Sequence, residues 1–310
     1  MVVSHHYFGF EEGYAGVTFF YVLSGYVLTV NYPHLESPAA RRAFWRKRFA
    51  RIYPNHLLML AFSVPVATGT LLALGAHLLL IQSWVPIWSV YFAFDAPSWS
   101  ISNEAAFYAA FPWLLAWLRP APSVRIFALG SAVAGFAAAW SILLPRQTLD
   151  SSATHFLFYI APPLRLLEFA LGVGLAMTQR SAIGARHEVA ALVIVALSFV
   201  IPAPPAFKAA LVFIPAGVAL VYVFSQSQGP LARALSSRAL VLLGDASFAL
   251  YMIHYPLRQY VLRWAGWSTG VAMLTALAAI ALSVLMFRYF EKPMQRRLLR
   301  PPISSSVSRA

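Results

Sequence analysis

One stretch, from residue 13 to residue 54, constrains the fold of this chain most strongly. It holds an apolar segment, GYAGVTFFYVLSGYVLTV, followed by a basic loop, RRAFWRKRFARIYP. The apolar segment is about long enough to cross a bilayer core as a helix, at ~1.5 Å per residue. Short loops rich in Lys and Arg stay on the cytoplasmic side. The sequence therefore predicts a span from outside to inside, and a next span, beginning near Tyr53, that runs back out.

The composition predicts an integral membrane protein. Of 310 residues, 60% are hydrophobic and 11% are charged, against roughly 45–50% and 25% in soluble domains. The net charge of +13 is explained by topology signals and contacts with acidic headgroups, so no nucleic-acid partner is predicted. The chain has no cysteine, which excludes disulfides, thiolate metal sites and a cysteine nucleophile.

Apolar runs bounded by charge, Pro or Gly predict an all-α fold, a polytopic bundle of about ten transmembrane helices. The first helix is expected to be incomplete, because only ten residues precede Glu11 and roughly 20 are needed to span a bilayer. The expected spans are 1–9, 13–31, 53–75, 103–118, 125–143, 155–178, 188–202, 207–225, 240–262 and 269–289. The segment 76–102, broken by Pro86, Asp95 and Pro97, is expected to be an interfacial or re-entrant connection on the outer side.

This layout places most of the 23 Lys and Arg residues on inner segments, as the positive-inside rule requires. It predicts a multi-pass protein of the plasma (cell inner) membrane with a cytoplasmic C-terminus. Residues 1–298 form the predicted membrane domain, and the small, polar residues of 299–310 form a disordered cytoplasmic tail.

Charged side chains at membrane depth cost a few kcal/mol and are functional candidates for that reason. Arg165 and Glu168 share one predicted helix face. They form either a self-neutralising structural pair or a pair that faces substrate, and the residues alone leave both open. Glu104 stands near the start of a predicted helix, with Ser102 as a candidate N-cap and Tyr108 four residues later. A capping charge is the alternative to a functional role for this carboxylate.

A polar stripe marks the helix predicted over 240–262. Ser247, Tyr251, His254 and Arg258 fall at i, i+4, i+7 and i+11, on one face of an otherwise apolar helix. Such a stripe must face protein or water. A satisfied buried histidine is the alternative reading of His254.

The first residues hold two adjacent histidines, His5 and His6, close to Glu11 and Glu12. An imidazole has an unperturbed pKa of ~6.5, so it can take a proton from a hydroxyl near neutral pH, and a carboxylate can orient it. No metal site is predicted, because no HExxH or similar ligand spacing occurs. The other histidines are predicted to contact lipid headgroups: His34, His56, His77, His155 and His187.

The basic loop allows a second interpretation. Arg41 to Arg51 could bind a polyanionic cofactor such as a nucleotide phosphate, with Phe44, Trp45 and Tyr53 among the aromatic faces available for stacking. On the residues alone, topology is the simpler explanation.

The motifs resemble those of the acyltransferase family 3 membrane proteins, in matching order over nearly the whole chain. Three departures stand out: Thr18 replaces a frequent aspartate, Ala105 replaces a common second glutamate, and the family's arginine upstream of the first-helix histidine is missing. The matching positions are Val2, Val3 and His5; Gly16 to Tyr26; Arg48, Arg51, Ile52 and Pro54; Trp99, Ser100, Ile101, Glu104, Phe107 and Tyr108; Arg165, Glu168, Phe169 and Gly172; Gly244, Ser247, Phe248, Tyr251, Met252, His254 and Pro256; and Phe290, Glu291 and Pro293.

The resemblance implies a membrane O-acyltransferase that moves an acyl group, expected to be acetyl, from acyl-CoA to a hydroxyl of a sugar, glycan or glycosylated metabolite. Its partners would be membrane lipid, acyl-CoA and a carbohydrate or glycosylated acceptor, with no metal. His5 would be the general base or a transient acyl carrier. The other implied site residues are Glu104 and His254 as further catalytic residues, Arg46, Arg48 and Arg51 for the CoA phosphates, and Ser24, Tyr108, Tyr251, Arg165 and Glu168 along a substrate channel.

Two alternatives remain at this level. A transporter or flippase of a glycan would use the same buried polar residues as a permeation path, and it would show inverted repeats, of which the sequence has no convincing example. An inactive family member is the other alternative, because the first helix is expected to be incomplete.

Overall fold

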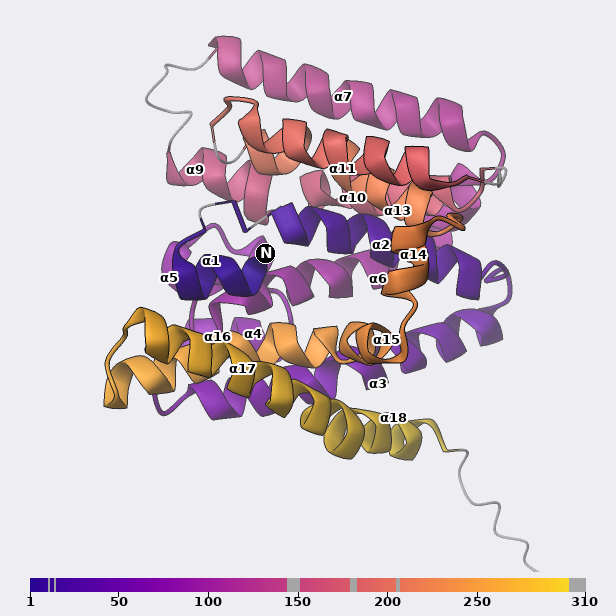
Figure 1. Cartoon of the computed structure of the whole chain (residues 1–310). Coiled ribbons are helices and arrows are strands. Elements are labelled where there is room, and N and C mark those ends of the chain that lie inside the picture. The colour runs from indigo at the N-terminus through magenta and orange to yellow at the C-terminus, as the bar shows by residue number, and fades with distance from the viewer. Residues whose placement is uncertain (11, 14, 144–150, 179–182, 205–206, 301–310) are drawn as a thin grey trace, which may run out of the picture.

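The computed structural model describes residues 1–10, 12–13, 15–143, 151–178, 183–204 and 207–300, and within these ranges its regular elements are helices. Figure 1 shows most of them running side by side in one bundle. The all-α prediction is confirmed for this part of the chain. The first half consists of α1 (Val2–Phe8), α2 (Ala15–Asn31), α3 (Pro38–Ser63), α4 (Leu71–Leu78), η1 (Gln82–Trp84), α5 (Trp88–Tyr91), η2 (Ala96–Ser98), α6 (Trp99–Leu118) and α7 (Pro122–Leu143).

The second half continues the bundle and contains three π-helical turns, η3, η4 and η5. Its elements are α9 (Ser152–His155), η3 (Phe156–Ile160), α10 (Pro162–Leu175), α11 (Ala185–Val200), η4 (Lys208–Val212), α13 (Ile214–Phe224), α14 (Pro230–Leu235), α15 (Arg238–Asp245), α16 (Ser247–Trp264), α17 (Thr269–Met286), η5 (Phe287–Glu291) and α18 (Lys292–Leu299).

Three helices of the described residues are long and apolar enough to cross a membrane by themselves: Pro122–Leu143, Ser152–Leu175 and Thr269–Leu299. A fourth candidate is the pair α15 and α16, which is bent by 61°. Two shorter apolar helices, α2 and α13, accompany them. The structure thus supports a membrane protein, while the count of about ten spans stays a prediction.

The basic segment is helical, so its prediction as a loop was wrong. α3 begins at Pro38 with Ser37 as its N-cap, whose hydroxyl accepts from the backbone N–H of Ala40 at 3.1 Å. Ser followed by Pro is a strong helix-start signal. No Gly or Pro interrupts the chain again until Pro54, which the helix accommodates. The cations therefore repeat at helical spacing on α3.

Further boundaries differ from the prediction. The span expected over 53–75 is interrupted, because α3 ends at Ser63 and α4 begins at Leu71. The span expected over 240–262 is broken between α15 and α16, next to Gly244 and Asp245, which are poor helix formers. The last helix continues through η5 and α18 to Leu299 rather than ending near 289. The predicted tail begins at that residue, and its remainder from Pro301 onward lies outside the described residues.

The segment 76–102 folds as short helical pieces around buried polar groups. The Nε2 of His56 lies 2.8 Å from the carbonyl of His77, and the Nε2 of His77 lies 3.0 Å from the carbonyl of Val90. Both rings are buried, at 1% and 0% exposure, so their prediction as headgroup contacts was wrong. A broken connection within a bundle needs such internal partners for its backbone.

α2 and α10 pack backbone against backbone at two glycines. A Cβ on Gly25 would lie 2.1 Å from the carbonyl oxygen of Phe169, and one on Gly172 would lie 1.9 Å from that of Val22. Small residues at such crossings permit close helix contact in membrane proteins. Around this crossing Phe107 stacks on Phe169, with ring centroids 5.3 Å apart, inside the largest apolar core.

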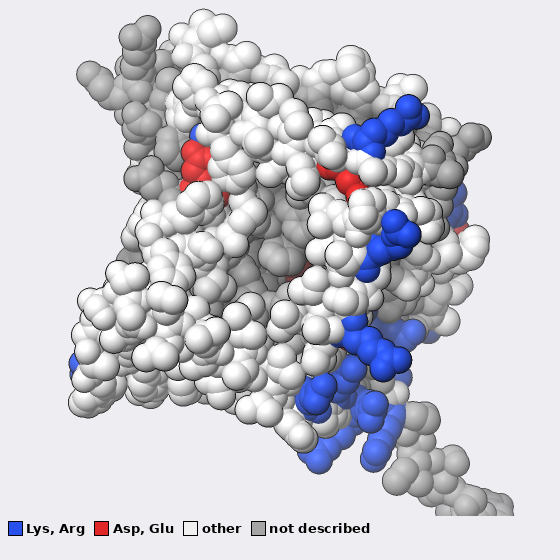
Figure 2. Space-filling model, in the orientation of Figure 1, with Lys and Arg blue, Asp and Glu red and all other residues white. Residues whose placement is uncertain are grey.

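The bundle has two chemically different ends (Figure 1). The N-terminal half of α3 lies with α14, α15 and α18 at one end, here called the basic end. Helices α1, α5 and α9 lie with the C-terminal half of α16 at the other, here called the histidine end. In Figure 2, Lys and Arg side chains gather along the basic end.

Candidate functional site

A cavity of about 380 Å³ lies toward the basic end, between α2, α3, α6 and the α15–α16 break. Figure 2 shows a hollow on this face of the molecule. Most of the cavity wall is apolar, from Val17 and Leu28 on α2 to Phe248 on α16. Its polar lining is Tyr21, Ser24, Arg48, Arg51, Ser100, Glu104, Tyr108, Asp245, Ser247 and Tyr251.

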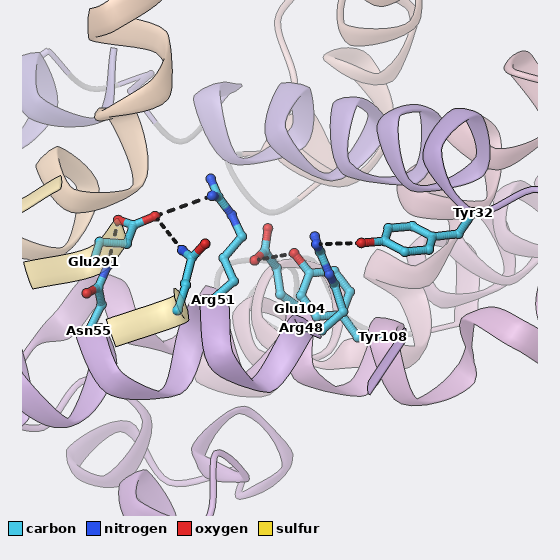
Figure 3. A network of polar contacts seen from close by, with 8 residues as sticks. Tyr32, Arg48, Arg51, Asn55, Glu104, Tyr108 and Glu291 are labelled. Carbon is cyan, nitrogen blue, oxygen red and sulfur yellow. Dashed lines mark hydrogen bonds and ion pairs between the residues drawn. The ribbon is translucent and has the colours of Figure 1, made fainter. Parts of the chain in front are cut away.

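Figure 3 shows how the charged groups of this cavity lie. Arg48 and Arg51 are one turn apart on α3 and share a face. The guanidinium of Arg48 donates to the hydroxyl of Tyr32 at 3.2 Å. Glu104 accepts from the hydroxyl of Tyr108 at 2.9 Å. Two guanidinium groups thus line one wall, with planar donors suited to phosphate oxygens.

Glu291 holds Arg51 from outside this cavity. It belongs to η5, is 1% exposed, and accepts from Arg51 at 3.3 Å, from Asn55 at 2.7 Å and from Gln295 at 3.1 Å. In the sequence, Glu291 stands out only as part of a terminal motif. The role of Glu291 could not be predicted from the sequence, because its partner Arg51 lies 240 positions away.

The predicted site residues at this end divide into two groups. Ser24, Arg48, Arg51, Glu104 and Tyr108 line the cavity together. Arg46, predicted beside Arg48 and Arg51, is not among the lining residues and donates to the carbonyl of Leu299 at 3.2 Å. The first group is the candidate anion site.

The helix start around Glu104 differs from its prediction. α6 begins at Trp99, a full turn before Ser102. The Ser102 hydroxyl donates to the carbonyl of Leu80 at 2.7 Å and accepts from the Ser83 hydroxyl at 2.7 Å. Ser102 therefore does not cap the helix, and Glu104 is not a capping charge. Its position on the cavity wall favours the functional reading.

A second cavity, of about 650 Å³, lies at the histidine end. Its lining comes from α1, α2, α5, η2, α6, α9, η3 and α16 and is rich in rings. The polar groups among the described lining residues are His5, His6, His155 and Arg258 with three tyrosines, and these residues include no carboxylate.

The local fold of α1 presents its two histidines to this cavity. α1 ends at Gly9, whose φ of 70° is left-handed and turns the chain back. The turn brings the carbonyl of Phe10 to 2.8 Å from the Nδ1 of His5. Gly13, between α1 and α2, lies so close to His5 that a Cβ on this glycine would lie 2.2 Å from the Cβ of the histidine.

His6 contacts the predicted catalytic residue His254 directly. The Nδ1 of His6 lies 3.0 Å from the Nε2 of His254. The Nδ1 of His254 lies 2.7 Å from the carbonyl of Tyr251, which can only accept, so the proton of His254 sits on Nδ1. His6 therefore donates from Nδ1 and keeps its lone pair on Nε2. Tyr7 also connects α1 to α16, because its hydroxyl donates to the backbone carbonyl of His254 at 2.8 Å.

His6 was not singled out as the base from the sequence, although one signal could have found it. The family's first helix ends in a motif of two valines, two further residues and a histidine. With Val2 and Val3 as the valines, that histidine is His6, whereas only one residue separates His5 from the pair. Of the two carboxylates expected to orient the histidines, Glu12 instead pairs with Lys208, and Glu11 lies outside the described residues.

The two cavities meet at Tyr251 and Val17, which line both. The Tyr251 hydroxyl lies 2.6 Å from that of Ser100 and 2.9 Å from the carbonyl of Pro97. The polar stripe of α16 runs along this junction. Ser247 faces the basic-end cavity and Arg258 the histidine-end cavity, which agrees with the expectation that the stripe faces protein or water.

Arg165 and Glu168 line neither of these cavities. They form an ion pair of 2.8 Å, with side chains 0% and 1% exposed. Arg165 also donates to Thr18 at 3.4 Å and lies over the ring of Tyr21. Their geometry favours the self-neutralising structural pair, at the contact of α10 with α2.

The remaining histidines differ from one another. His34 is exposed, with 82% of its side chain accessible, and His187 accepts from the N–H of Gly184 at 3.3 Å. His155 packs among aromatic rings and lines the histidine-end cavity, a position its prediction as a headgroup contact missed. Within the described ranges, no three His, Asp or Glu side chains gather closely enough to hold a metal ion, and the expectation of a metal-free site stays a prediction.

Comparison with known proteins yields consistent matches. Residues 2–288 match the family model described as an acyltransferase domain, that of acyltransferase family 3. The acyltransferase MdmB of Streptomyces mycarofaciens is 32% identical over 332 aligned positions, covering 95% of this chain and 84% of the relative. The peptidoglycan O-acetyltransferase OatA of Listeria monocytogenes is 25% identical over 328 positions, covering 92% of this chain and 52% of the relative. No solved structure matches the chain.

Proposed function

The chain belongs to acyltransferase family 3, and we propose that it is a membrane-embedded O-acyltransferase that moves an acyl group, expected to be acetyl, from acyl-CoA to a hydroxyl of a sugar, glycan or glycosylated metabolite. The related peptidoglycan O-acetyltransferase supports a carbohydrate acceptor by its name. The single observation that carries the proposal is the pair of cavities that meet at Tyr251 and Val17. One is lined by guanidinium groups and the other by histidines.

Acyl-CoA fits the basic-end cavity. Arg48 and Arg51 would bind its phosphates, and the apolar wall would take the pantetheine arm. Arg46 lies on the same helix but outside this cavity. The thioester would then reach the junction near Tyr251. Glu104 and Tyr108 would line this donor channel together with Ser24, rather than the acceptor side.

The acceptor hydroxyl would reach the junction from the histidine end. His6 takes its proton on Nε2 while the oxygen attacks the thioester carbonyl, and the C–S bond breaks to give the thiolate of CoA. The proton then passes from the imidazolium to the thiolate, so protons balance. His254 accepts the Nδ1–H of His6 and thereby fixes its ring and tautomer. His5 lines the same cavity and is the second candidate for base or transient acyl carrier.

We place the basic end and the C-terminus on the cytoplasmic side of the plasma membrane, because Lys and Arg gather at the basic end. The fold offers about ten helical units for the predicted spans. They are α1, α2, α3, α6, α7, α9 with α10, α11, η4 with α13, α15 with α16, and α17 with η5 and α18.

Orientation can be tested by single-cysteine labelling, which is simple because the chain has no native cysteine. Arg233→Cys on α14 and Ser268→Cys before α17 lie on opposite sides in this proposal. A membrane-impermeant maleimide added to whole cells should label Ser268→Cys only. The reverse pattern would invert the proposed topology.

The activity is tested with radiolabelled acetyl-CoA and the protein in phospholipid nanodiscs. Transfer of label to a glycan acceptor, lost in His6→Ala and retained in His34→Ala, is the expected result. Label transfer that survives both His6→Ala and His5→Ala would exclude the histidine end as the reaction site.

A further inference from the structure

We infer that the histidine-end cavity is a binding site for an uncharged, hydroxylated ring compound such as a neutral glycoside, and that His155 and its aromatic neighbours determine this selectivity. The inference rests on the proposed function, in which this cavity receives the acceptor. It goes further, because it assigns the binding surface and the charge that the surface admits.

The walls of the cavity suit a sugar ring. Trp88, Phe92, Trp99, Tyr159 and Tyr255 all line it. Flat aromatic faces pack against the C–H faces of a pyranose, while a few placed polar groups bind its hydroxyls. Trp99 and Tyr159 already pack against each other, with ring centroids 4.7 Å apart and planes tilted by 57°.

The charge of the cavity disfavours a cation. Among the described residues, its lining includes Arg258 and no carboxylate. Asp95, in the connection beside it, is 1% exposed, and neither carboxyl oxygen has a hydrogen-bond partner within the described part of the chain. Burial raises the pKa of the Asp95 carboxyl well above its usual range, which disfavours its charged form. A protonated amino sugar would lose its hydration here and gain no counter-ion from the described lining residues. Aromatic rings attract cations, but the guanidinium of Arg258 opposes that attraction.

His155 supplies a polar group on the wall formed by the α9–η3 junction. Its ring lies 5.3 Å from that of Trp88 and 5.2 Å from that of Tyr159. Its Nδ1 is enclosed without a hydrogen-bond partner in the described structure. Nε2 is therefore the nitrogen available to a ligand. His155 thus presents Nε2, a donor or an acceptor according to its tautomer, between aromatic faces, an arrangement that suits a hydroxyl beside a C–H face.

The test is a binding measurement without acyl donor, so it does not depend on turnover. The protein is placed in phospholipid nanodiscs, free of sugar-based detergents that would compete. The probes are 4-nitrophenyl N-acetyl-β-glucosaminide, which is neutral, and 4-nitrophenyl 2-amino-2-deoxy-β-glucoside, whose amine is cationic below its pKa. Quenching of tryptophan fluorescence reports binding, and 4-nitroanisole controls for the aglycone.

We expect the neutral glycoside to bind at least tenfold more tightly than the cationic one and than 4-nitroanisole. His155→Phe keeps the aromatic packing and should weaken binding of the neutral probe about tenfold. His34→Ala, at an exposed position, should leave binding unchanged. Equal binding of both glycosides, or binding unaffected by His155→Phe, would overturn the inference. Intact selective binding without acyl transfer would instead count against the proposed function alone.

Discussion

The two cavities share α2, α6 and α16 but differ in what they can bind. The basic-end cavity carries two guanidinium groups, of Arg48 and Arg51, and two carboxylates, of Glu104 and Asp245. The histidine-end cavity carries rings, imidazoles and one arginine, and the described residues that line it include no carboxylate. The first therefore suits a polyanion with an apolar arm, and the second an uncharged acceptor. An acyltransferase needs both, and the difference shows which substrate each end admits.

The two cavities share one principle of construction. The central side chain of each comes from an N-terminal helix and is held by a residue from the C-terminal part of the chain. Arg51 on α3 is held by Glu291 of η5, and His6 on α1 by His254 of α16. The last elements of the bundle thus position both ends of the reaction path. Four substitutions break or sharpen this comparison.

The largest effect is expected from His6→Ala. Removing a general base lowers turnover by ~10²–10⁴-fold. Acetyl-CoA binding, measured by equilibrium dialysis, should remain normal because the basic-end cavity is untouched. His5→Ala is the matched control and should cost less, since His5 lacks the contact with His254. A larger loss in His5→Ala than in His6→Ala would transfer the base role to His5.

Arg51→Ala should affect the donor alone. Hydrogen bonds to charged groups contribute about 1.5–3 kcal/mol, so KM for acetyl-CoA should rise roughly 10- to 100-fold. KM for the acceptor should not change. Arg46→Ala, the neighbouring cation outside the cavity, is the control and should have little effect. Equal losses in the two variants would point to general surface charge rather than to this cavity.

Glu291→Gln should give a smaller donor effect, because Glu291 acts through Arg51. We expect KM for acetyl-CoA to rise by about three- to tenfold with kcat unchanged, as one charge-assisted bond is weakened. In a double variant with Arg51→Ala, the two effects should not add. Additive losses would show that Glu291 has a separate role.

The smallest effect is expected from Tyr251→Phe, the one variant that should touch both cavities. It removes a hydroxyl bonded to Ser100 and Pro97 and keeps the ring. Steady-state kinetics should show modest changes, of about two- to fivefold, in both KM values. A change in only one KM would mean that Tyr251 does not stand at the junction.

Sequence periodicity predicted the helices and the polar stripe of α16, because apolar runs and helical spacing are local properties. Glu104 and Tyr108 stood out on a predicted helix, because a carboxylate on an apolar helix is visible without knowing its neighbours. Arg48 and Arg51 were implied only by the resemblance, since the basic residues alone indicated topology. The structure brings the four side chains to one cavity, and their roles stay predictions.

Other features depend on pairs far apart in the chain. His6 and His254 are 248 positions apart, so no local pattern links them. His56 and His77 resemble headgroup contacts in the sequence, yet both are buried against backbone carbonyls. The helical basic segment is different, because Ser37 and Pro38 signalled its start and positive-inside reasoning alone suggested a loop.

The central claim is that donor and acceptor reach the junction at Tyr251 from opposite ends of the bundle. It is tested most directly in sealed proteoliposomes of defined orientation, with acetyl-CoA on one side and a membrane-impermeant glycan on the other. Transfer should occur when acetyl-CoA is on the side of the basic end and the glycan on the side of the histidine end. Transfer only when both substrates share one side would contradict the claim.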